Sequence, residues 1–327
     1  MNHALGLLLG VVADAAIGDP RRGHPVALFG KWASHLERHL HRDSIAAGAL
    51  YLAAALAPVA ALGVAAESIS RRRPILHTAL TAAATWAVLG AHSLASEGEQ
   101  MADELDQDDL GAARERLTHL CSRDPSGLSA DELARGTVES LAENTADAVV
   151  CSLFWGAAFG IPGLLLHRGI NTLDAMVGYR NHRYERFGKA AALLDDAVAY
   201  VPARLAGAVS CLLAPAVGGS TRTAWRVMLR DSRNHPSPNG GWTEAAWAGA
   251  LAVRLGGPSH YHGRVEHRPY LGDEGAPGPD SAAIRKAARL VGSVTAASTA
   301  VAVAVRLSRP MRTDSSRGCS TPPFEDG

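Results

Sequence analysis

Three acidic side chains recur at a regular spacing in the middle of the chain. Glu139, Glu143 and Asp147 are four residues apart, and on an α-helix this spacing places them within about 80° of one face. Like charges on one stripe repel one another, so the arrangement favours a bound cation. Magnesium suits it, because Mg²⁺ takes one or two carboxylates together with substrate phosphates. A solvated acidic face is the alternative, although the apolar run after Asp147 makes a free carboxylate there costly.

A second polar stretch covers residues 171–188. It contains Asp174 and then Arg180, Arg183 and Arg186 at intervals of three. Arginines at this spacing can hold a phosphate or a carboxylate through paired hydrogen bonds. The same residues would also suit a basic helix beside a membrane, in contact with lipid headgroups. Both interpretations stay open on these residues alone.

Two adjacent aspartates form a third motif. Asp195 and Asp196 precede Pro202-Ala-Arg204-Leu. Neighbouring residues on a helix point about 100° apart, so one carboxylate could bind a metal while the other pairs with Arg204. The alternative is an acidic pair near a helix N-terminus, where the helix dipole stabilises it.

Three shorter motifs are each typical of a turn when taken singly. They are Gly18-Asp-Pro with His24-Pro, Ser122-Arg123-Asp124, and His235-Pro-Ser-Pro-Asn239-Gly-Gly-Trp-Thr-Glu244. The phosphate-binding patterns G-x-x-x-x-G-K-[ST] and G-x-G-x-x-G opening a βαβ unit are absent from the sequence. Any nucleotide site in this chain must therefore be built from carboxylates, arginines and backbone turns.

Apolar segments must position these residues, and several approach membrane-spanning character. Four of them lie near residues 45–66, 76–96, 198–219 and 290–305. The first carries no charge and is long enough for a hydrocarbon core of about 30 Å. A fifth run, residues 148–166, is interrupted by Gly160, Pro162 and Gly163. We expect it to span the membrane or to enter and return. A soluble protein with buried helices is the alternative.

Composition and pattern favour a helical fold. Apolar residues make up 47% of the chain, and the formal net charge is zero, so nothing indicates a bulk attraction to nucleic acid. Alternating strand patterns are nearly absent, and Ser129-Ala-Asp-Glu132 predicts a capped helix start. The four scattered cysteines lack C-x-x-C spacing, which disfavours a zinc site. We predict an all-α, polytopic integral membrane protein, with one membrane-embedded catalytic domain over residues 1–307 and a disordered tail over 308–327.

Taken in chain order, the motifs resemble one family closely, the CobD/CbiB adenosylcobinamide-phosphate synthases of cobalamin biosynthesis. The matching blocks include Glu139-Ser-Leu-Ala-Glu-Asn-Thr-Ala-Asp147, Asn171-Thr-Leu-Asp-Ala-Met-Val-Gly-Tyr-Arg180, Leu194-Asp-Asp196, Pro202-Ala-Arg-Leu205 and Ser237-Pro-Asn-Gly-Gly-Trp-Thr-Glu244. Single blocks can arise by chance, but the ordered set is specific. Four positions depart from the family pattern: Pro125, Cys151, Ser152 and Ala199. Ala199 stands where the family usually has Asn, which removes a polar group from the predicted site.

The resemblance implies a multi-pass enzyme of the bacterial inner membrane. Such an enzyme joins adenosylcobyric acid, through its free propionate, to (R)-1-amino-2-propanol phosphate, and it uses ATP and Mg²⁺. An amide forms in water only after the carboxylate is activated, most simply as an acyl phosphate. Phosphoryl transfer in turn calls for magnesium on acidic ligands and for cations on the phosphates. Other enzymes of the cobalamin pathway are possible partners.

Roles can be assigned to residues as expectations. The predicted catalytic residues are Asp174, Asp195, Asp196, Glu143 and Asn171. The predicted metal ligands are Glu143, Asp147 and Asp195. The residues expected to hold substrate and phosphate groups are Arg123, Arg180, Arg183, Arg204, His24, Ser237, Asn239 and Glu244.

Two functions of other classes compete with a ligase. One is a transporter with an ion path through the membrane, and the other is a membrane scaffold that passes on corrinoid intermediates without catalysis. The polar motifs lie beside the apolar segments rather than in their middle, and no inverted repeat is visible, which disfavours a transporter. Because ATP is cytoplasmic, a ligase requires residues 168–198 on that side. We therefore expect residues 148–166 not to cross the membrane.

Overall fold

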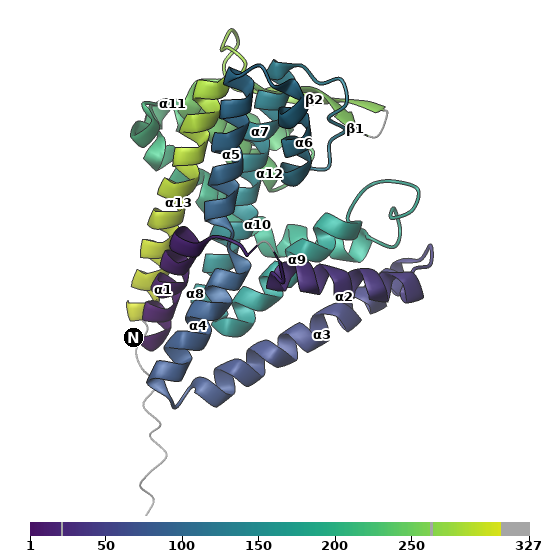
Figure 1. Ribbon diagram of the computed structural model, residues 1–327, viewed down its shortest axis with the longest axis vertical. Helices are drawn as coiled ribbons and strands as arrows, with labels where there is room; N and C mark the ends of the chain where they lie inside the picture. The colour runs from purple at the N-terminus through teal and green to yellow at the C-terminus, as the bar shows by residue number, and fades with distance from the viewer. Residues whose placement is uncertain (21, 262–263, 309–327) are drawn as a thin grey trace, which may run out of the picture.

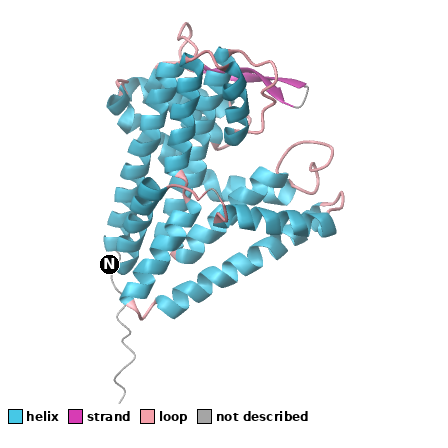
Figure 2. Ribbon diagram, viewed as in Figure 1, coloured by secondary structure: helices cyan, strands magenta, loops and turns pink. Residues whose placement is uncertain are grey.

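The computed structural model describes residues 1–20, 22–261 and 264–308, and helices make up most of this part (Figure 1, Figure 2). The elements in chain order are α1 (Asn2–Ile17), α2 (Pro25–Leu40), α3 (Ile45–Ser70), α4 (Pro74–Val88), α5 (Ala91–Asp106), α6 (Leu110–Leu120), α7 (Ala130–Asn144), η1 (Thr145–Cys151), α8 (Ser152–Phe159), α9 (Ile161–Val177), α10 (Lys189–Leu213), η2 (Ala214–Val217), α11 (Thr221–Asp231), η3 (Ser232–Asn234), α12 (Gly240–Leu251), β1 (Leu255–Tyr261), β2 (Arg264–Leu271) and α13 (Ser281–Ser308). Beyond Ser308, the predicted tail lies outside the described residues.

Within the described residues, four helical segments are long and apolar enough to cross a membrane. They are Ile45–Ser70, Pro74–Asp106, Lys189–Val217 and Ser281–Ser308, and each overlaps one of the four predicted spans. The second comprises α4 and α5, which meet at Gly90, where φ is 96°. In the most apolar window of α3 only 17% of the residues are buried, so this helix offers its apolar surface to lipid. The predicted all-α, polytopic fold is confirmed.

The interrupted apolar run folds back on itself. α7, the π-helical η1 and α8 follow one another directly up to Gly160, where φ is 78°, and α9 then packs against α8. A side chain at Gly163 would collide with the carbonyl of Trp155, which shows how closely the two helices approach. The chain thus reverses at residues 160–163, as a segment that enters and returns would require. The side of the membrane on which it lies stays a prediction.

Two apolar cores hold the helices together. The larger core runs through the main bundle, between α5, α7, α12 and α13. The smaller core lies around Tyr51, Leu173 and Phe187, where α2, α3 and α9 pack together. In Figure 1 these three helices form an arm that leaves the main bundle to one side. α9 and α10 connect the two parts, because each packs both on α3 and on η1.

A tryptophan replaces a backbone hydrogen bond that α10 lacks. Pro202 lies inside this helix, and proline has no N–H to donate to the carbonyl four residues earlier. That carbonyl belongs to Val198, and it accepts a hydrogen bond of 3.0 Å from Nε1 of Trp155. The contact fixes α8 against α10 within one turn of Asp195 and Asp196.

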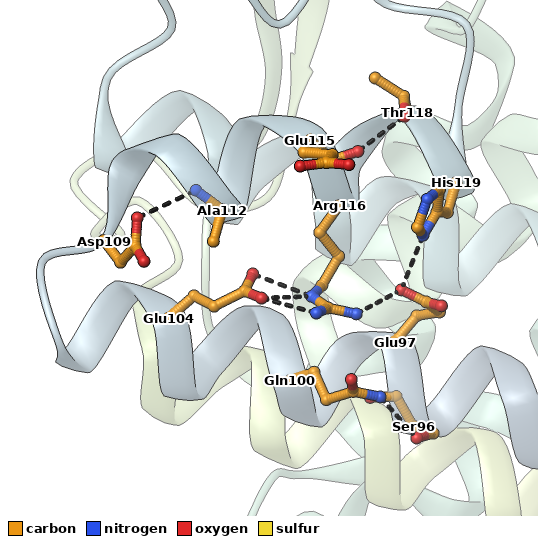
Figure 3. A network of polar contacts seen from close by, with 10 residues as sticks. All are labelled: Ser96, Glu97, Gln100, Glu104, Asp109, Ala112, Glu115, Arg116, Thr118 and His119. Atoms are coloured by element: carbon orange, nitrogen blue, oxygen red, sulfur yellow. Dashed lines mark hydrogen bonds and ion pairs between the residues drawn. The ribbon is translucent and has the colours of Figure 1, made fainter.

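Charged side chains join α5 to α6 (Figure 3). Arg116 on α6 donates to both carboxylate oxygens of Glu104 at 2.6 to 2.9 Å. Its Nη1 donates to Glu97 at 2.8 Å. Both helices pack on α7, whose N-terminus carries the predicted capping box between Ser129 and Glu132. The frame around α7 is therefore fixed by polar contacts as well as by the core.

The hairpin of β1 and β2 is a difference from the sequence-based expectation. The strands pair antiparallel, with Leu255 opposite Leu271. Their glycines and prolines argue against strands in a sequence pattern. Side chains of α7 hold the first strand instead: Glu139 Oε1 accepts from the backbone N–H of Gly256 at 2.7 Å, and Arg135 donates to the carbonyl of Pro258 at 2.5 Å. Tertiary contacts, rather than local pattern, produce this hairpin.

Candidate active site

Five carboxylates from four elements converge where the arm joins the main bundle. They are Glu143 on α7, Asp147 on η1, Asp174 on α9, and Asp195 and Asp196 on α10. The negative charges of Asp195, Glu143 and Asp174 raise the pKa of Asp147. The charge of Asp196 raises the pKa of Asp174 in the same way. We call this group the carboxylate cluster. All five residues were predicted catalytic residues or metal ligands, and the fold brings them together.

The acidic stripe predicted on one helix face is divided. Glu139 is buried and forms an ion pair with Arg123, while its second oxygen accepts from Gly256. Burial alone would raise the pKa of Glu139, but the charge of Arg123 and the hydrogen bonds outweigh it and hold the pKa below its ordinary value. Asp147 lies beyond, in the π-helical turn, which changes the helical register. Arg123, expected to contact a phosphate, thus faces Glu139.

The carboxylate cluster is electrostatically unfavourable without a cation. Burial raises the pKa of Glu143, and the neighbouring charge of Glu244 raises it further. Burial, Asp196 and Glu143 raise the pKa of Asp174 to about 6. Oδ1 of Asp195 is buried and has no hydrogen-bond partner. Oxygen ligands with excess negative charge are what Mg²⁺ prefers, so the cluster has the charge to attract a magnesium ion. Among the described residues, however, the oxygens of Glu143, Asp147 and Asp195 do not gather within 4.8 Å of one another.

Two histidines have the same geometry, and each precedes a proline. In both His24 and His235, Nδ1 accepts the backbone N–H two residues later, at 3.3 and 3.1 Å. Their Nε2 atoms lie 3.2 Å from Asp19 and from Glu244, respectively. An accepting Nδ1 places the proton on Nε2, facing the carboxylate. Although burial opposes it, Glu244 raises the pKa of His235.

His235 and Glu244 form a buried pair that the sequence-based prediction covered only in part. Glu244 was expected to hold substrate, whereas His235 was interpreted as a turn residue. The signal available in the sequence was a lone glutamate in the otherwise apolar segment Gly240–Leu251. In the fold this glutamate is 1% exposed, and its charge acts on Glu143. The pair therefore borders the carboxylate cluster.

The loop before α12 is tied to α10 beside the cluster. Asn239 donates to the backbone carbonyl of Asp196 at 2.9 Å and accepts from Nη1 of Arg204 at 3.2 Å. The guanidinium of Arg204 lies 3.5 Å from the ring centroid of Tyr200. Ser237 Oγ accepts the backbone N–H groups of Asn239 and the next residue at 3.2 and 3.1 Å. Arg204, Ser237 and Asn239, three of the residues expected to hold substrate, therefore lie close together beside the cluster.

Comparison with known proteins decides the family. The family model described as CobD/Cbib protein matches residues 7–291. The chain belongs to this family. The cobalamin biosynthesis protein CobD of Mycobacterium tuberculosis (strain ATCC 25618 / H37Rv) is 49% identical over 303 residues, which are 92% of this chain and 95% of that protein.

More distant relatives extend the family match. Proteins of the same name from Geobacter metallireducens and Rhodobacter capsulatus are 43% and 37% identical. They align with 87% and 92% of this chain, and the alignments cover 91% and 96% of those proteins. No solved structure matches the chain. The resemblance seen in the motifs is confirmed, and family membership gives the chain a role in cobalamin biosynthesis.

The remaining predicted residues of this CobD/Cbib chain occupy different places. Asn171 hydrogen-bonds Asp195 and accepts from Arg168 at 3.4 Å. The positive charge of Arg180 attracts the carboxylate of Asp196. Arg183 donates instead to Glu37 on α2 at 2.8 Å, so its guanidinium stabilises the arm rather than the cluster. Of these residues, Asn171 and Arg180 border the carboxylate cluster.

A half-buried arginine that the sequence-based prediction did not single out lies beside the site. The negative charges of Asp19 and Asp147 both favour the charged form of the Arg168 guanidinium on α9, and Asp19 contributes more. Asp19 in turn faces His24, so charges from the loop after α1 and from the cluster both act on Arg168. Nothing local in the sequence distinguishes Arg168, and only the motif Gly18-Asp-Pro with His24-Pro hinted at a role for this loop.

Proposed function

We propose that this chain catalyses ATP-dependent amide-bond formation in cobalamin biosynthesis. It would join adenosylcobyric acid to (R)-1-amino-2-propanol phosphate and give adenosylcobinamide phosphate. The carboxylate cluster, in a chain matched to the CobD/Cbib family over residues 7–291, is the observation that carries the proposal. Amide formation of this kind needs a cation site and a proton acceptor close together, and the half-buried carboxylates of the cluster can provide both.

The reaction balances in two steps. In the first, an oxygen of the corrinoid propionate attacks the γ-phosphorus of ATP, and ADP leaves. In the second, the amine nitrogen attacks the acyl carbon, the C–O bond breaks, and inorganic phosphate leaves. A proton must depart from the ammonium group before or during that attack. A carboxylate with a raised pKa is suited to accept it, and the pKa of Asp174 is raised to about 6.

We propose that a metal ion would be held on one side of the cluster. Glu143, Asp147 and Asp195 would hold Mg²⁺, which when bound would neutralise phosphate charge during transfer. Asn171 hydrogen-bonds Asp195 and so orients that carboxylate. Arg180, whose charge acts on Asp196, is placed to pair with an incoming phosphate. Arg204 and Asn239 position the loop that borders the site.

Use of ATP also bears on location. We propose a multi-pass protein of the bacterial inner membrane, with the carboxylate cluster on the cytoplasmic side. The four helical segments able to cross a membrane support the multi-pass arrangement. The amine phosphate is charged and water-soluble, so it too would arrive from the cytoplasm.

The experiment is a reconstituted reaction. Full-length protein in detergent is mixed with adenosylcobyric acid, the amine phosphate, Mg²⁺ and ATP, and the corrinoid product is followed by mass spectrometry. We expect the mass of the amide, with ADP release that requires both substrates. Asp174→Ala and Asp195→Ala should each lower turnover by at least about 100-fold. Substrate binding without product would instead indicate a scaffold and contradict the proposal.

A further inference from the structure

A pocket of about 440 Å³ opens between α10, η3 and the start of α12. The side chains that matter for its chemistry are Tyr200, Arg204, Ser232, Arg233, His235 and Trp242. Ligand pockets commonly measure about 300–1,000 Å³, so this one suits a small molecule. A corrinoid that carries an adenosyl group is far too large to enter it.

One end of the pocket is suited to an anion. Within the part of the chain that the structure describes, Arg233 makes no hydrogen bond or ion pair. Oγ of Ser232 is buried, only 2% of the residue is exposed, and this hydroxyl has no partner. Arg204 is held in place by the rings of Tyr200 and Trp242. Two guanidinium groups and an unpartnered hydroxyl are what a phosphate needs.

No carboxylate lines the pocket itself, but one of its walls lies beside the carboxylate cluster. Asp196 lies four residues before Tyr200 on α10, and side chains at this spacing are neighbours on one helix face. Asn239 donates to the backbone carbonyl of Asp196 and accepts from Nη1 of Arg204, so the loop that lines the pocket is tied to α10 next to the cluster. His235, which lines the pocket, faces Glu244. Negative charge on this side suits a cation.

We propose that the pocket binds a small organic phosphate that carries a primary ammonium group. The phosphate lies against Arg233, Arg204 and Ser232, and the ammonium group points toward Asp196. This inference rests on the proposed function, in which the pocket is the subsite of the amine substrate. Arg233 and Ser232, to which no role was assigned, become residues that determine specificity for the phosphorylated amine. The corrinoid then approaches the cluster from outside the pocket.

The first test compares two arginines in full-length protein in detergent. Arg233→Ala removes the free guanidinium of the pocket, and Arg222→Ala removes an exposed arginine on α11 outside it. Dissociation constants for 1-amino-2-propanol phosphate and for a non-hydrolysable ATP analogue with Mg²⁺ are measured by calorimetry. We expect Arg233→Ala to weaken binding of the amine phosphate by about tenfold or more. Arg222→Ala should change it less than about twofold, and Arg233→Lys should restore part of the affinity.

The second test addresses the ammonium end. Propan-2-yl phosphate has the phosphate on the same carbon but lacks the amine, so the ratio of the two dissociation constants reports the ammonium contact. In wild-type protein the amine phosphate should bind about tenfold more tightly than propan-2-yl phosphate. Asp196→Asn should reduce this ratio toward one and leave the affinity for propan-2-yl phosphate unchanged. An unchanged ratio in Asp196→Asn would overturn the proposed orientation.

Failure of the subsite and failure of the ligase are distinguishable. If Arg233→Ala forms product with an unaltered KM for the amine phosphate, the subsite is wrong and the ligase function stands. If Arg233→Ala weakens the ATP analogue instead, the pocket is a nucleotide site and the inference is overturned. If wild-type protein binds the amine phosphate through Arg233 but forms no amide, the subsite stands and the ligase function fails.

Discussion

At the scale of single residues, two glutamates one turn apart on α7 serve different purposes. Glu139 is paired with Arg123 and with a backbone N–H of the hairpin, so its charge stabilises the fold. Glu143 lies among Glu244, His235 and the other carboxylates, so its charge opposes folding unless a cation is present. Residues with unfavourable electrostatics inside a fold are common at functional sites.

Glutamine substitutions separate the two glutamates. Glu139→Gln leaves Arg123 buried without a counter-charge, so we expect the free energy of unfolding to fall by roughly 3 kcal/mol. Glu143→Gln removes a repulsive charge and should leave stability within about 1 kcal/mol of wild type, or raise it. Urea unfolding in detergent without Mg²⁺ measures both. Equal destabilisation by the two substitutions would contradict these assignments.

The ion pair of Glu139 also predicts a pH dependence. Its pKa is lowered in the folded protein, relative to about 4.3 for an unfolded chain. The stabilisation is therefore complete above the unfolded value and is lost as pH falls through the lower folded value. The difference in stability between wild type and Glu139→Gln should shrink as pH falls below about 4. A difference that stays constant down to about pH 3 would argue against the pair.

The sequence predicted which residues form the site better than it predicted which residues pair with one another. Spacing and charge were enough to single out Glu143, Asp174 and Asp195, because the motifs that carry them are local. The pairing of Glu139 depends on a hairpin more than a hundred residues later in the chain, at Gly256. Such a contact has no local signature, and the register change in η1 has none either.

At the scale of elements, α8 and α10 are coupled through one indole. Trp155→Phe removes the donor to Val198 O, and we expect a cost of about 1 kcal/mol in free energy of unfolding. In a Pro202→Ala background the new N–H can reach the same carbonyl, so the tryptophan substitution should cost less. A double-mutant cycle in detergent measures this coupling. Strictly additive effects would show that the two groups do not share the carbonyl.

Length and apolar character located the helical segments that are able to cross a membrane, and internal breaks were harder to predict. Residues 45–66 were identified because helices in the core of a soluble protein rarely stay uncharged over so many turns, and α3 covers them. The break at Gly90 falls inside an apolar run, and a single glycine is not enough to predict it. The β1–β2 hairpin was missed because α7 side chains, not alternating residues, hold it in place.

At the scale of the whole molecule, the two ends of the described chain lie on the same side. Figure 1 shows the N-terminus, the α3–α4 connection and the end of α13 at one end of the long axis. The arginine-rich loop 178–188 lies instead at the other end of α3, where Gly48 contacts Phe187 and Arg186 pairs with Asp43 at 3.7 Å. Because α3 is long and apolar enough to cross a membrane, we expect its two ends to lie on opposite sides.

Cysteine labelling tests this arrangement in cells. With ATP as a substrate, loop 178–188 must be cytoplasmic, so Asn181→Cys should resist an impermeant thiol reagent and Arg72→Cys should react with it. Arg71, Arg72 and Arg73 would favour the reverse orientation by the positive-inside rule, so the outcome is decisive. The remaining cysteines are replaced by serine in both variants. Periplasmic labelling at position 181 alone would refute a cytoplasmic site.

The fate of one oxygen atom tests the proposed acyl phosphate most directly. Adenosylcobyric acid labelled with ¹⁸O in its free carboxylate is incubated with the amine phosphate, ATP, Mg²⁺ and the full-length protein. If the carboxylate is activated as an acyl phosphate, each amide formed transfers one ¹⁸O to inorganic phosphate, and ADP accumulates in equal amount. Amide formed without ATP, label found in AMP, or no amide at all would contradict it.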